Sequence, residues 1–191
     1  MNRRKALLRI TLAGVGIAAA SGAYKCYSIV KTPDLSYAAN NRDLIAALAE
    51  TILPATDTPG AREAGVHDFI LKMLSHCMDR KEQNTFIRGL KDIQTHCLSR
   101  YGREYPQCTP DQQEATMTGL EANSSPPSGV VGKVKLRLLG RPFFSILKEY
   151  TVEGYCTSEL GATKGLSYVY IPGSFRGCIP LEPGQKSWAT N

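Results

Sequence analysis

The sequence predicts a mainly α-helical fold, a small domain of about five helices followed by a long irregular C-terminal arm. Between residues 41 and 151, apolar residues recur at spacings of three and four in one window after another, as in helices with one buried face. From residue 152 to residue 191 this period is lost, and the segment contains six glycines and three prolines. This change in residue pattern divides the chain into a helical domain, 41–151, and an arm, 152–191.

Residues 1–25 have the three parts of an export signal: a charged start, an apolar stretch from residue 10 to residue 20, and small residues at 21–23. The pair Arg3 and Arg4 resembles a twin-arginine signal. An ordinary secretory signal and an uncleaved anchor are the alternatives. The apolar stretch is shorter than the roughly 20 residues that a membrane-spanning helix needs, which disfavours a permanent anchor.

The first helices follow a predicted linker at residues 26–40. Asn41 is expected to cap a helix that ends before Pro54, with Leu44, Ile45 and Leu48 on its buried face. A second helix carries a buried stripe from Val66 to Cys77.

The later helices have clear start and stop signals. A third helix, from about Lys81 to Tyr101, is expected to end at Gly102. Thr109 is expected to cap a fourth helix that ends near Asn123, with Gln112 reaching back to the cap. A fifth helical region carries Leu136, Leu139, Phe143, Leu147 and Tyr150, and Pro142 is expected to break or kink it.

The arm allows two interpretations. It is either a loop fixed to the protein's own core, with a disulfide between Cys156 and Cys178 as one way of holding it, or an arm ordered by another protein. Residues 166–171 are its one candidate for extended structure. Aromatic residues often anchor interfaces, which favours the second interpretation. The candidate interface residues are Tyr155, Tyr168, Tyr170, Phe175 and Trp188.

Charge and cysteine content exclude several functions. The chain has 23 basic and 17 acidic residues, but residues 1–25 contain five of the basic ones and no acidic one. The remaining 18 and 17 nearly balance, so the sequence does not predict nucleic-acid binding. Six cysteines make disulfides feasible after export, in pairings that the sequence does not rank. No Cys-x-x-Cys, His-x-x-x-His or haem-attachment spacing occurs, so no metal or cofactor site is predicted in this chain.

No catalytic residues are assigned either. The stretch YTVEGYCTSELG, residues 150–161, contains hydroxyls, a thiol and two carboxylates, but no histidine follows His96 to activate Cys156. Gly154 and Gly161 are expected to permit tight backbone geometry, and Thr157 and Ser158 to bind nearby amide groups. His67 and Asp68 are adjacent on a predicted helix, where neighbouring side chains point in different directions, so no dyad is expected. The sequence also lacks the Gly-x-Gly-x-x-Gly motif of dinucleotide binding.

Four segments in order resemble the gluconate 2-dehydrogenase subunit 3 family. They are LAETILPATDTPGAREAGVHDFI at 48–70, FIRGL at 86–90, FFSILKEYTVEGYCTSELG at 143–161 and YVYIPGSFRGCIPLEPGQKSWA at 168–189. The resemblance implies the small subunit of a bacterial, membrane-bound, flavin-dependent gluconate or sugar dehydrogenase. In such a complex a large flavoprotein of the glucose-methanol-choline type carries FAD and oxidises the sugar, and a cytochrome subunit with haem c takes the electrons.

Two classes of function remain open at this level. The first is a non-catalytic accessory subunit that binds and stabilises the flavoprotein and supports its export through the twin-arginine translocase, which implies a periplasmic position at the outer face of the inner membrane. A transient export chaperone differs from it only in lifetime. The second class is a stand-alone enzyme or ligand-binding protein of the cell envelope.

Overall fold

The computed structural model describes residues 31–124, 136, 140–171 and, within the arm, 173–174, 177–178, 180 and 183–189. These residues form a mainly α-helical fold, as the sequence predicts, and they contain no strand, only a bridge between Ser167 and Trp188. The elements are α2 (Leu35–Asn40), α3 (Arg42–Ile52), α4 (Val66–His76), α5 (Arg80–Tyr101), η1 (Tyr105–Gln107), α6 (Pro110–Ser124), α8 (Phe143–Thr157) and η2 (Gly161–Gly165).

The predicted ends of α5 and α6 are confirmed. Gly102 follows α5 with a φ of 67°, a left-handed conformation that glycine adopts without strain. At the start of α6, the backbone amide of Thr109 donates to Oε1 of Gln112 at 3.1 Å, which is the predicted reach of Gln112 back to the cap. Local capping chemistry therefore fixes both ends of the η1 connection between these helices.

The start of the helical domain differs from the prediction. Asn41 precedes α3, but its side chain makes no capping hydrogen bond and instead donates to the carbonyl oxygen of Tyr37 at 2.8 Å. It does so because a short helix, α2, lies within the predicted linker and ends at this point. Asp34 caps α2 by accepting from the amide of Tyr37 at 3.3 Å. The described helical structure thus begins at Leu35.

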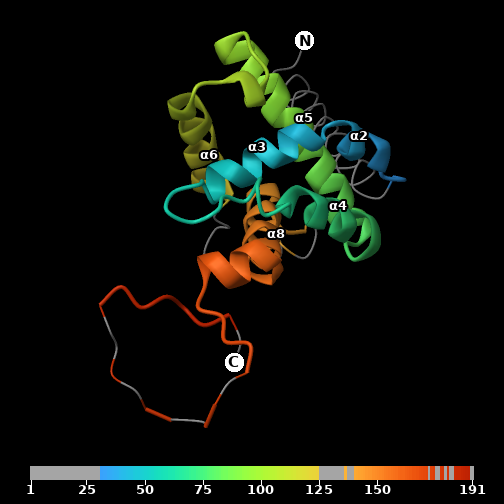
Figure 1. The fold of residues 1–191 in the computed structure, drawn as a ribbon. Helices are drawn as coiled ribbons and strands as arrows, with labels where there is room; N and C mark the ends of the chain where they lie inside the picture. Colours follow the sequence, from blue (N-terminus) through green and yellow to red (C-terminus); the bar gives the residue numbers. More distant parts are fainter. Residues whose placement is uncertain are drawn as a thin grey trace, which may run out of the picture.

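Helix α8 is the centre of the fold and packs against α3, α4, α5 and α6 (Figure 1). Its start lies directly after Pro142, which explains why the predicted fifth helical region breaks there. The rings of Phe86 on α5 and Phe143 on α8 pack at a centroid distance of 5.2 Å. Gly89 makes this approach feasible, because a Cβ at that position would lie 2.2 Å from the Phe143 ring.

The boundary between helical domain and arm lies later than predicted. Helix α8 continues to Thr157 rather than ending at Thr151, and one π-helical turn, η2, follows it. The irregular arm therefore begins after Gly165, and its described residues lie outside the helical body (Figure 1). No helix within the described part of the chain is long and apolar enough to cross a membrane.

Candidate partner-binding surface

The base of the arm is fixed to the helical domain by Tyr155. This side chain is 9% exposed, and its hydroxyl donates to the carbonyl oxygen of Pro59 at 2.8 Å. Gly165 packs directly on it, since a Cβ there would lie 2.5 Å from the Tyr155 hydroxyl. The sequence-based expectation that Tyr155 is an exposed interface aromatic is therefore wrong: Tyr155 belongs to the core and positions the arm.

The polar residues of the stretch 150–161 organise the turn between α8 and η2. Ser158 Oγ accepts from the amide of Gly161 at 3.0 Å, as expected, and donates to the carbonyl oxygen of Tyr155 at 2.7 Å. Thr157 instead donates to the carbonyl oxygen of Glu153 at 2.7 Å. Gly154 lies against Phe69 of α4, where a Cβ would approach the ring to 2.7 Å. These contacts give the stretch a structural role.

Residues 186–189 return to the base of the arm. The amide of Ser167 donates to the carbonyl oxygen of Ser187 at 2.8 Å, and the amide of Ala189 donates to that of Ser167 at 2.9 Å. Lys186 Nζ adds a hydrogen bond to the carbonyl oxygen of Lys164 at 2.5 Å. The predicted extended segment 166–171 is therefore not a strand, because only Ser167 pairs with another part of the chain. The arm closes into a loop with both ends beside η2 (Figure 1).

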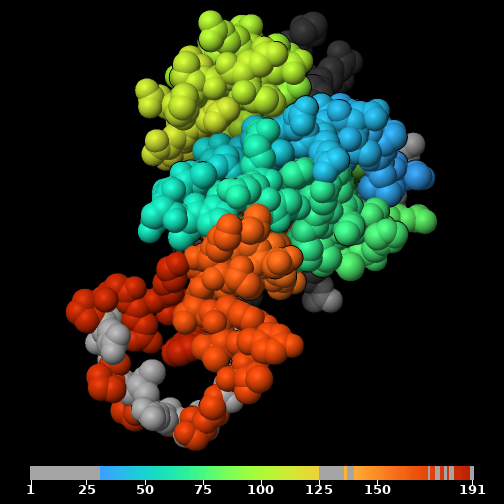
Figure 2. Space-filling model, viewed as in Figure 1, coloured from blue at the N-terminus to red at the C-terminus, as the bar shows by residue number. Residues whose placement is uncertain are grey.

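The arm lies next to the C-terminal end of α8 (Figure 2), and it carries apolar side chains that are exposed to solvent. Tyr170 is 83% exposed, Ile171 76% and Trp188 49%, and Tyr168 and Val169 are exposed as well. Of the described residues after Gly161, none is buried. The described residues of the arm therefore add no side chain to the buried core of the helical domain. We call Tyr168, Val169, Tyr170, Ile171 and Trp188 the arm surface.

Sequence reasoning identified the aromatic members of this surface and missed the two aliphatic ones. Val169 and Ile171 alternate with Tyr168 and Tyr170 in an uninterrupted apolar run before Pro172, which is the signal that could have found them. Phe175, the remaining predicted interface aromatic, lies outside the described residues, as do the signal residues Arg3 and Arg4.

Cys156 and Cys178 are both free thiols in the structure. Cys156 is half-buried on α8, and Cys178 is exposed on the arm. A disulfide between them stays a prediction. The described residues contain no group of three histidine, cysteine or acidic side chains arranged to hold a metal ion.

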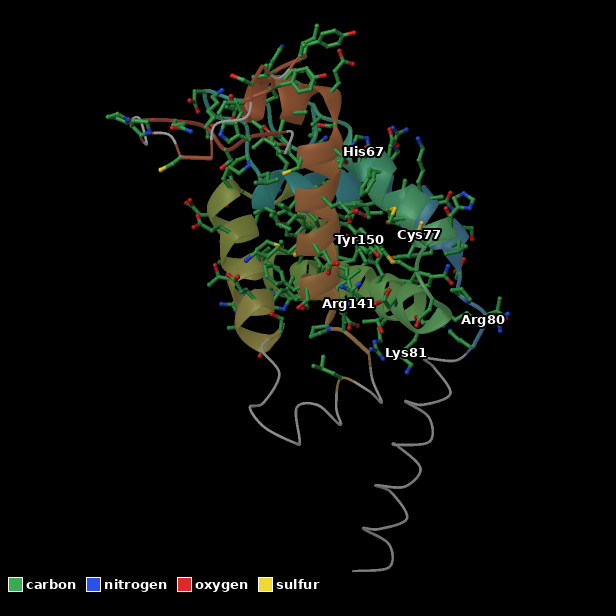
Figure 3. All side chains as sticks on the ribbon, turned by 90° about the horizontal axis from the view of Figure 1, so that it is seen from below. His67, Cys77, Arg80, Lys81, Arg141 and Tyr150 are labelled. Carbon is green, nitrogen blue, oxygen red and sulfur yellow. The ribbon has the colours of Figure 1, made fainter. Side chains whose placement is uncertain are left out.

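His67 and Asp68 do not form a catalytic pair. Nε2 of His67 lies 3.8 Å from Oδ2 of Asp68, whereas Arg42 binds the same oxygen at 2.5 Å. Burial lowers the pKa of His67 in spite of the nearby carboxylate, and its Nδ1 is buried without a partner. His67 lies toward the arm end of α8, and Arg141, bound to Glu82 at 2.8 Å, lies toward the opposite end (Figure 3).

One hollow on the surface is lined by charged side chains that the sequence analysis did not place together. It has a volume of about 410 Å³ and lies between α5 and α6. Asp92, His96 and Arg100 line it from successive turns of α5, with Thr116 and Asn123 opposite on α6. Their spacing of four residues on α5 is the signal that places them on one face.

Comparison with known proteins supports the resemblance found in the sequence. The searches gave no match among curated proteins or among solved structures. The profile of the family "gluconate 2-dehydrogenase subunit 3" matches residues 39–173, which run from the end of α2 into the arm surface. The match includes nearly all of the described helical domain and most of the arm surface, so it covers both parts of the structure. The chain belongs to the gluconate 2-dehydrogenase subunit 3 family.

Proposed function

We propose that this chain is a non-catalytic accessory subunit that binds the large flavoprotein subunit of a gluconate or related sugar dehydrogenase through its arm surface. The observation that carries the proposal is the exposure of five apolar side chains on a segment outside the helical body. Several large apolar side chains exposed on one segment are typical of protein interaction sites. Membership of a family named for a dehydrogenase subunit supplies the class of partner.

The anchoring of the arm supports a docking role. Ordering a free chain on a partner costs about 1 to 2 kcal/mol of backbone entropy per residue. Here the hydrogen bonds of Ser167 with Ser187 and Ala189 already hold the two ends of the loop together, and Tyr155 and Gly165 hold its base. A loop that is closed before binding loses less entropy when it docks, which increases affinity for the same contacts.

The proposal includes chemistry that lies in other subunits. The flavoprotein would carry the FAD and oxidise the sugar, and a cytochrome with haem c would receive the electrons. This chain would contribute binding, stability and export, with Arg3 and Arg4 as a twin-arginine signal for the complex and the outer face of the inner membrane as its destination.

The hollow between α5 and α6 is the observation that favours the second candidate, a ligand-binding protein of the cell envelope. Arg100, His96 and Asp92 would provide both donors and acceptors for a small polar ligand. Substitutions can test the two proposals independently, because the hollow is formed by α5 and α6 whereas the arm surface begins after η2.

A binding experiment with matched variants tests the first proposal. When the chain is co-expressed with a glucose-methanol-choline-type flavoprotein from the same organism, the two should be captured together. Tyr170→Ala combined with Trp188→Ala should weaken capture about tenfold or more, because large aromatics dominate interface energies. Leu98→Ala is the matched control, since Leu98 is also exposed at 49% but lies on α5.

The outcome of this experiment decides between the candidates. Unchanged capture by the arm variant, with normal circular dichroism, would contradict the arm surface as the docking site. Loss of capture by Leu98→Ala alone would instead place the contact on α5. Arg100→Ala should leave capture unchanged under the first proposal, and a specific ligand lost in that variant would support the second.

A further inference from the structure

Two buried cysteines meet where η1 packs against α5. Cys97 belongs to α5, and Cys108 directly follows η1. Cys97 has no exposed surface and Cys108 is 7% exposed, and both belong to the hydrophobic core. Both are free thiols in the structure, and Cys108 Sγ donates to the carbonyl oxygen of Glu104 at 3.4 Å. The Cys97 thiol lies close enough to the Cys108 thiol for the two to interact electrostatically. The two sulfur atoms are thus neighbours in the folded chain.

The surrounding contacts fix the position of the segment that carries Cys108. After Gly102 turns the chain, Tyr105 is fully buried, and its hydroxyl donates to Thr51 Oγ1 at 2.9 Å. Gln113 Nε2 donates to the carbonyl oxygen of Tyr105 at 3.0 Å. The amide of Cys108 donates to the same carbonyl at 3.1 Å. The segment that carries Cys108 is therefore held by α3 on one side and by α6 on the other, so the approach to Cys97 does not depend on a loose loop.

We propose that Cys97 and Cys108 are a disulfide-forming pair, oxidised to an intramolecular bond that links η1 to α5 once the chain meets an oxidising compartment. Disulfide geometry demands Cβ atoms a few ångströms apart, which requires two cysteines held side by side. Cys97 and Cys108 meet this requirement, because η1 packs against α5 and both side chains lie in the same buried cluster. Export is part of the proposed function, but the contact between the thiols is independent of it. Among the cysteines that the structure describes, Cys77 and Cys178 are exposed and Cys156 is half-buried on α8.

The difference in exposure indicates which of the two cysteines reacts first with the oxidant. The oxidant is a disulfide, either a small molecule such as oxidised glutathione or a protein oxidant of the envelope. Cys108, the more accessible of the two buried thiols, loses its proton to solvent, and its sulfur bonds to one sulfur of the oxidant. The oxidant's S–S bond breaks and its other sulfur leaves as a thiolate.

Cys97 then completes the exchange. It loses its proton, and its sulfur attacks Cys108 Sγ, which breaks the mixed disulfide and releases the second sulfur of the oxidant. Two protein thiols are oxidised and one disulfide is reduced to two thiols. Burial raises the pKa of the Cys97 thiol to about 11, which suits a group that reacts second and intramolecularly. The same burial shields the finished bond from reductants.

Peptide mapping tests the pair directly. All six cysteines lie on different tryptic peptides, because Lys25, Lys31, Lys72, Arg80, Lys91, Arg100, Arg103, Lys133, Lys148, Lys164, Arg176 and Lys186 separate them. The purified full chain would be reduced, equilibrated with oxidised and reduced glutathione, trapped with acid, alkylated in denaturant and digested. We expect a cross-linked pair of the peptides 92–100 and 104–133 that disappears after reduction.

Variants and alternative outcomes make the test decisive. Cys108→Ser should remove the cross-link, and Cys77→Ser should leave it intact. Alkylation of both Cys97 and Cys108 in the oxidised wild-type protein would overturn the proposal, as would a lasting glutathione adduct on Cys108 or a cross-link of either residue to another cysteine. The wild-type comparison stands even if Cys108→Ser fails to fold. Since neither flavoprotein nor export is involved, the result is independent of partner binding.

Discussion

The hydroxyl of Tyr155 donates a hydrogen bond to the carbonyl oxygen of Pro59 at 2.8 Å, and this contact joins the C-terminal part of α8 to the loop before α4. Because Tyr155 also packs against Gly165, one side chain connects the helical domain to the base of the arm. The position of the arm surface therefore depends on a residue that is itself buried.

Tyr155→Phe should destabilise the protein by about 0.5 to 1.5 kcal/mol, since it removes one hydrogen bond and keeps the ring. The free energy of unfolding, measured by urea denaturation and circular dichroism, checks this value. Tyr170→Phe is the control, because Tyr170 is largely exposed and its change should stay within about 0.5 kcal/mol of zero. Equal effects of the two substitutions would show that the buried hydrogen bond is not the cause.

Two helical glycines should respond to alanine in opposite directions. Gly89→Ala places a methyl group 2.2 Å from the Phe143 ring, so α5 and α8 must separate, and we expect a loss of about 1 to 3 kcal/mol. Gly119 of α6 has open space around it, so Gly119→Ala should stabilise by roughly 0.5 to 1 kcal/mol through helix propensity. Thermal and urea denaturation of both variants provide the measurement, and stabilisation by Gly89→Ala would contradict the close approach of the two helices.

Sequence patterns predicted the helices well where the governing interactions are local. Gly102 and the Thr109–Gln112 pair act within one turn of their own helix ends, so their neighbours in sequence decide the outcome. Asn41 shows the limit of this reasoning. Asparagine is a common capping residue, but the side chain of Asn41 binds the carbonyl oxygen of Tyr37 in α2 and does not cap α3.

The candidate surface was predictable only in part, because exposure depends on contacts between distant segments. Tyr155 and Tyr168 look alike in sequence, yet Tyr155 faces Pro59, 96 residues earlier in the chain, and Tyr168 faces solvent. The Cys97 and Cys108 thiols likewise meet through the fold of η1 onto α5, which no cysteine spacing motif encodes. Composition identified the arm, and tertiary packing decided which of its residues are exposed.

The redox state should change the stability of the protein in alkaline solution. Burial raises the pKa of Cys97 from 9.0 to about 11, so the unfolded chain loses this proton at lower pH than the folded chain. The contribution of the protonated Cys97 thiol to the free energy of unfolding is fully present below pH 9.0 and is lost as the pH rises toward 11. Burial raises the pKa of Tyr105 as well, which adds a loss that begins above 10.0.

Denaturation curves measured from about pH 8 to pH 11 separate the two contributions. The reduced protein should lose stability more steeply than the oxidised protein, because a Cys97 in a disulfide carries no proton to titrate. Cys97→Ala in the reduced state should flatten the curve in the same way. Identical pH dependence of the reduced wild type and this variant would exclude Cys97 as the titrating group.

Export should depend on the arginine pair at the start of the chain. If Arg3 and Arg4 form a twin-arginine signal that serves two proteins, replacing both with lysine should leave this chain and its flavoprotein together in the cytoplasm. Lysine keeps the charge but lacks the planar guanidinium, so a general charge effect is excluded by design. Cell fractionation with antibodies to both proteins gives the result, and normal periplasmic flavoprotein in the variant would contradict a shared signal.

Deletion of residues 166–191 should separate folding from docking. The cut follows η2, so Gly161 and Gly165 remain packed at Tyr155, and none of the described residues removed is buried. We expect helical circular dichroism to be retained while capture of the flavoprotein is lost, since the whole arm surface is absent. A shorter deletion of residues 173–180, which keeps every residue of the arm surface, is the matched control and should retain most of the binding. Unfolding of the larger truncation would mean that the arm is part of the core after all, and full binding by a folded truncation would move the interface to the helical body.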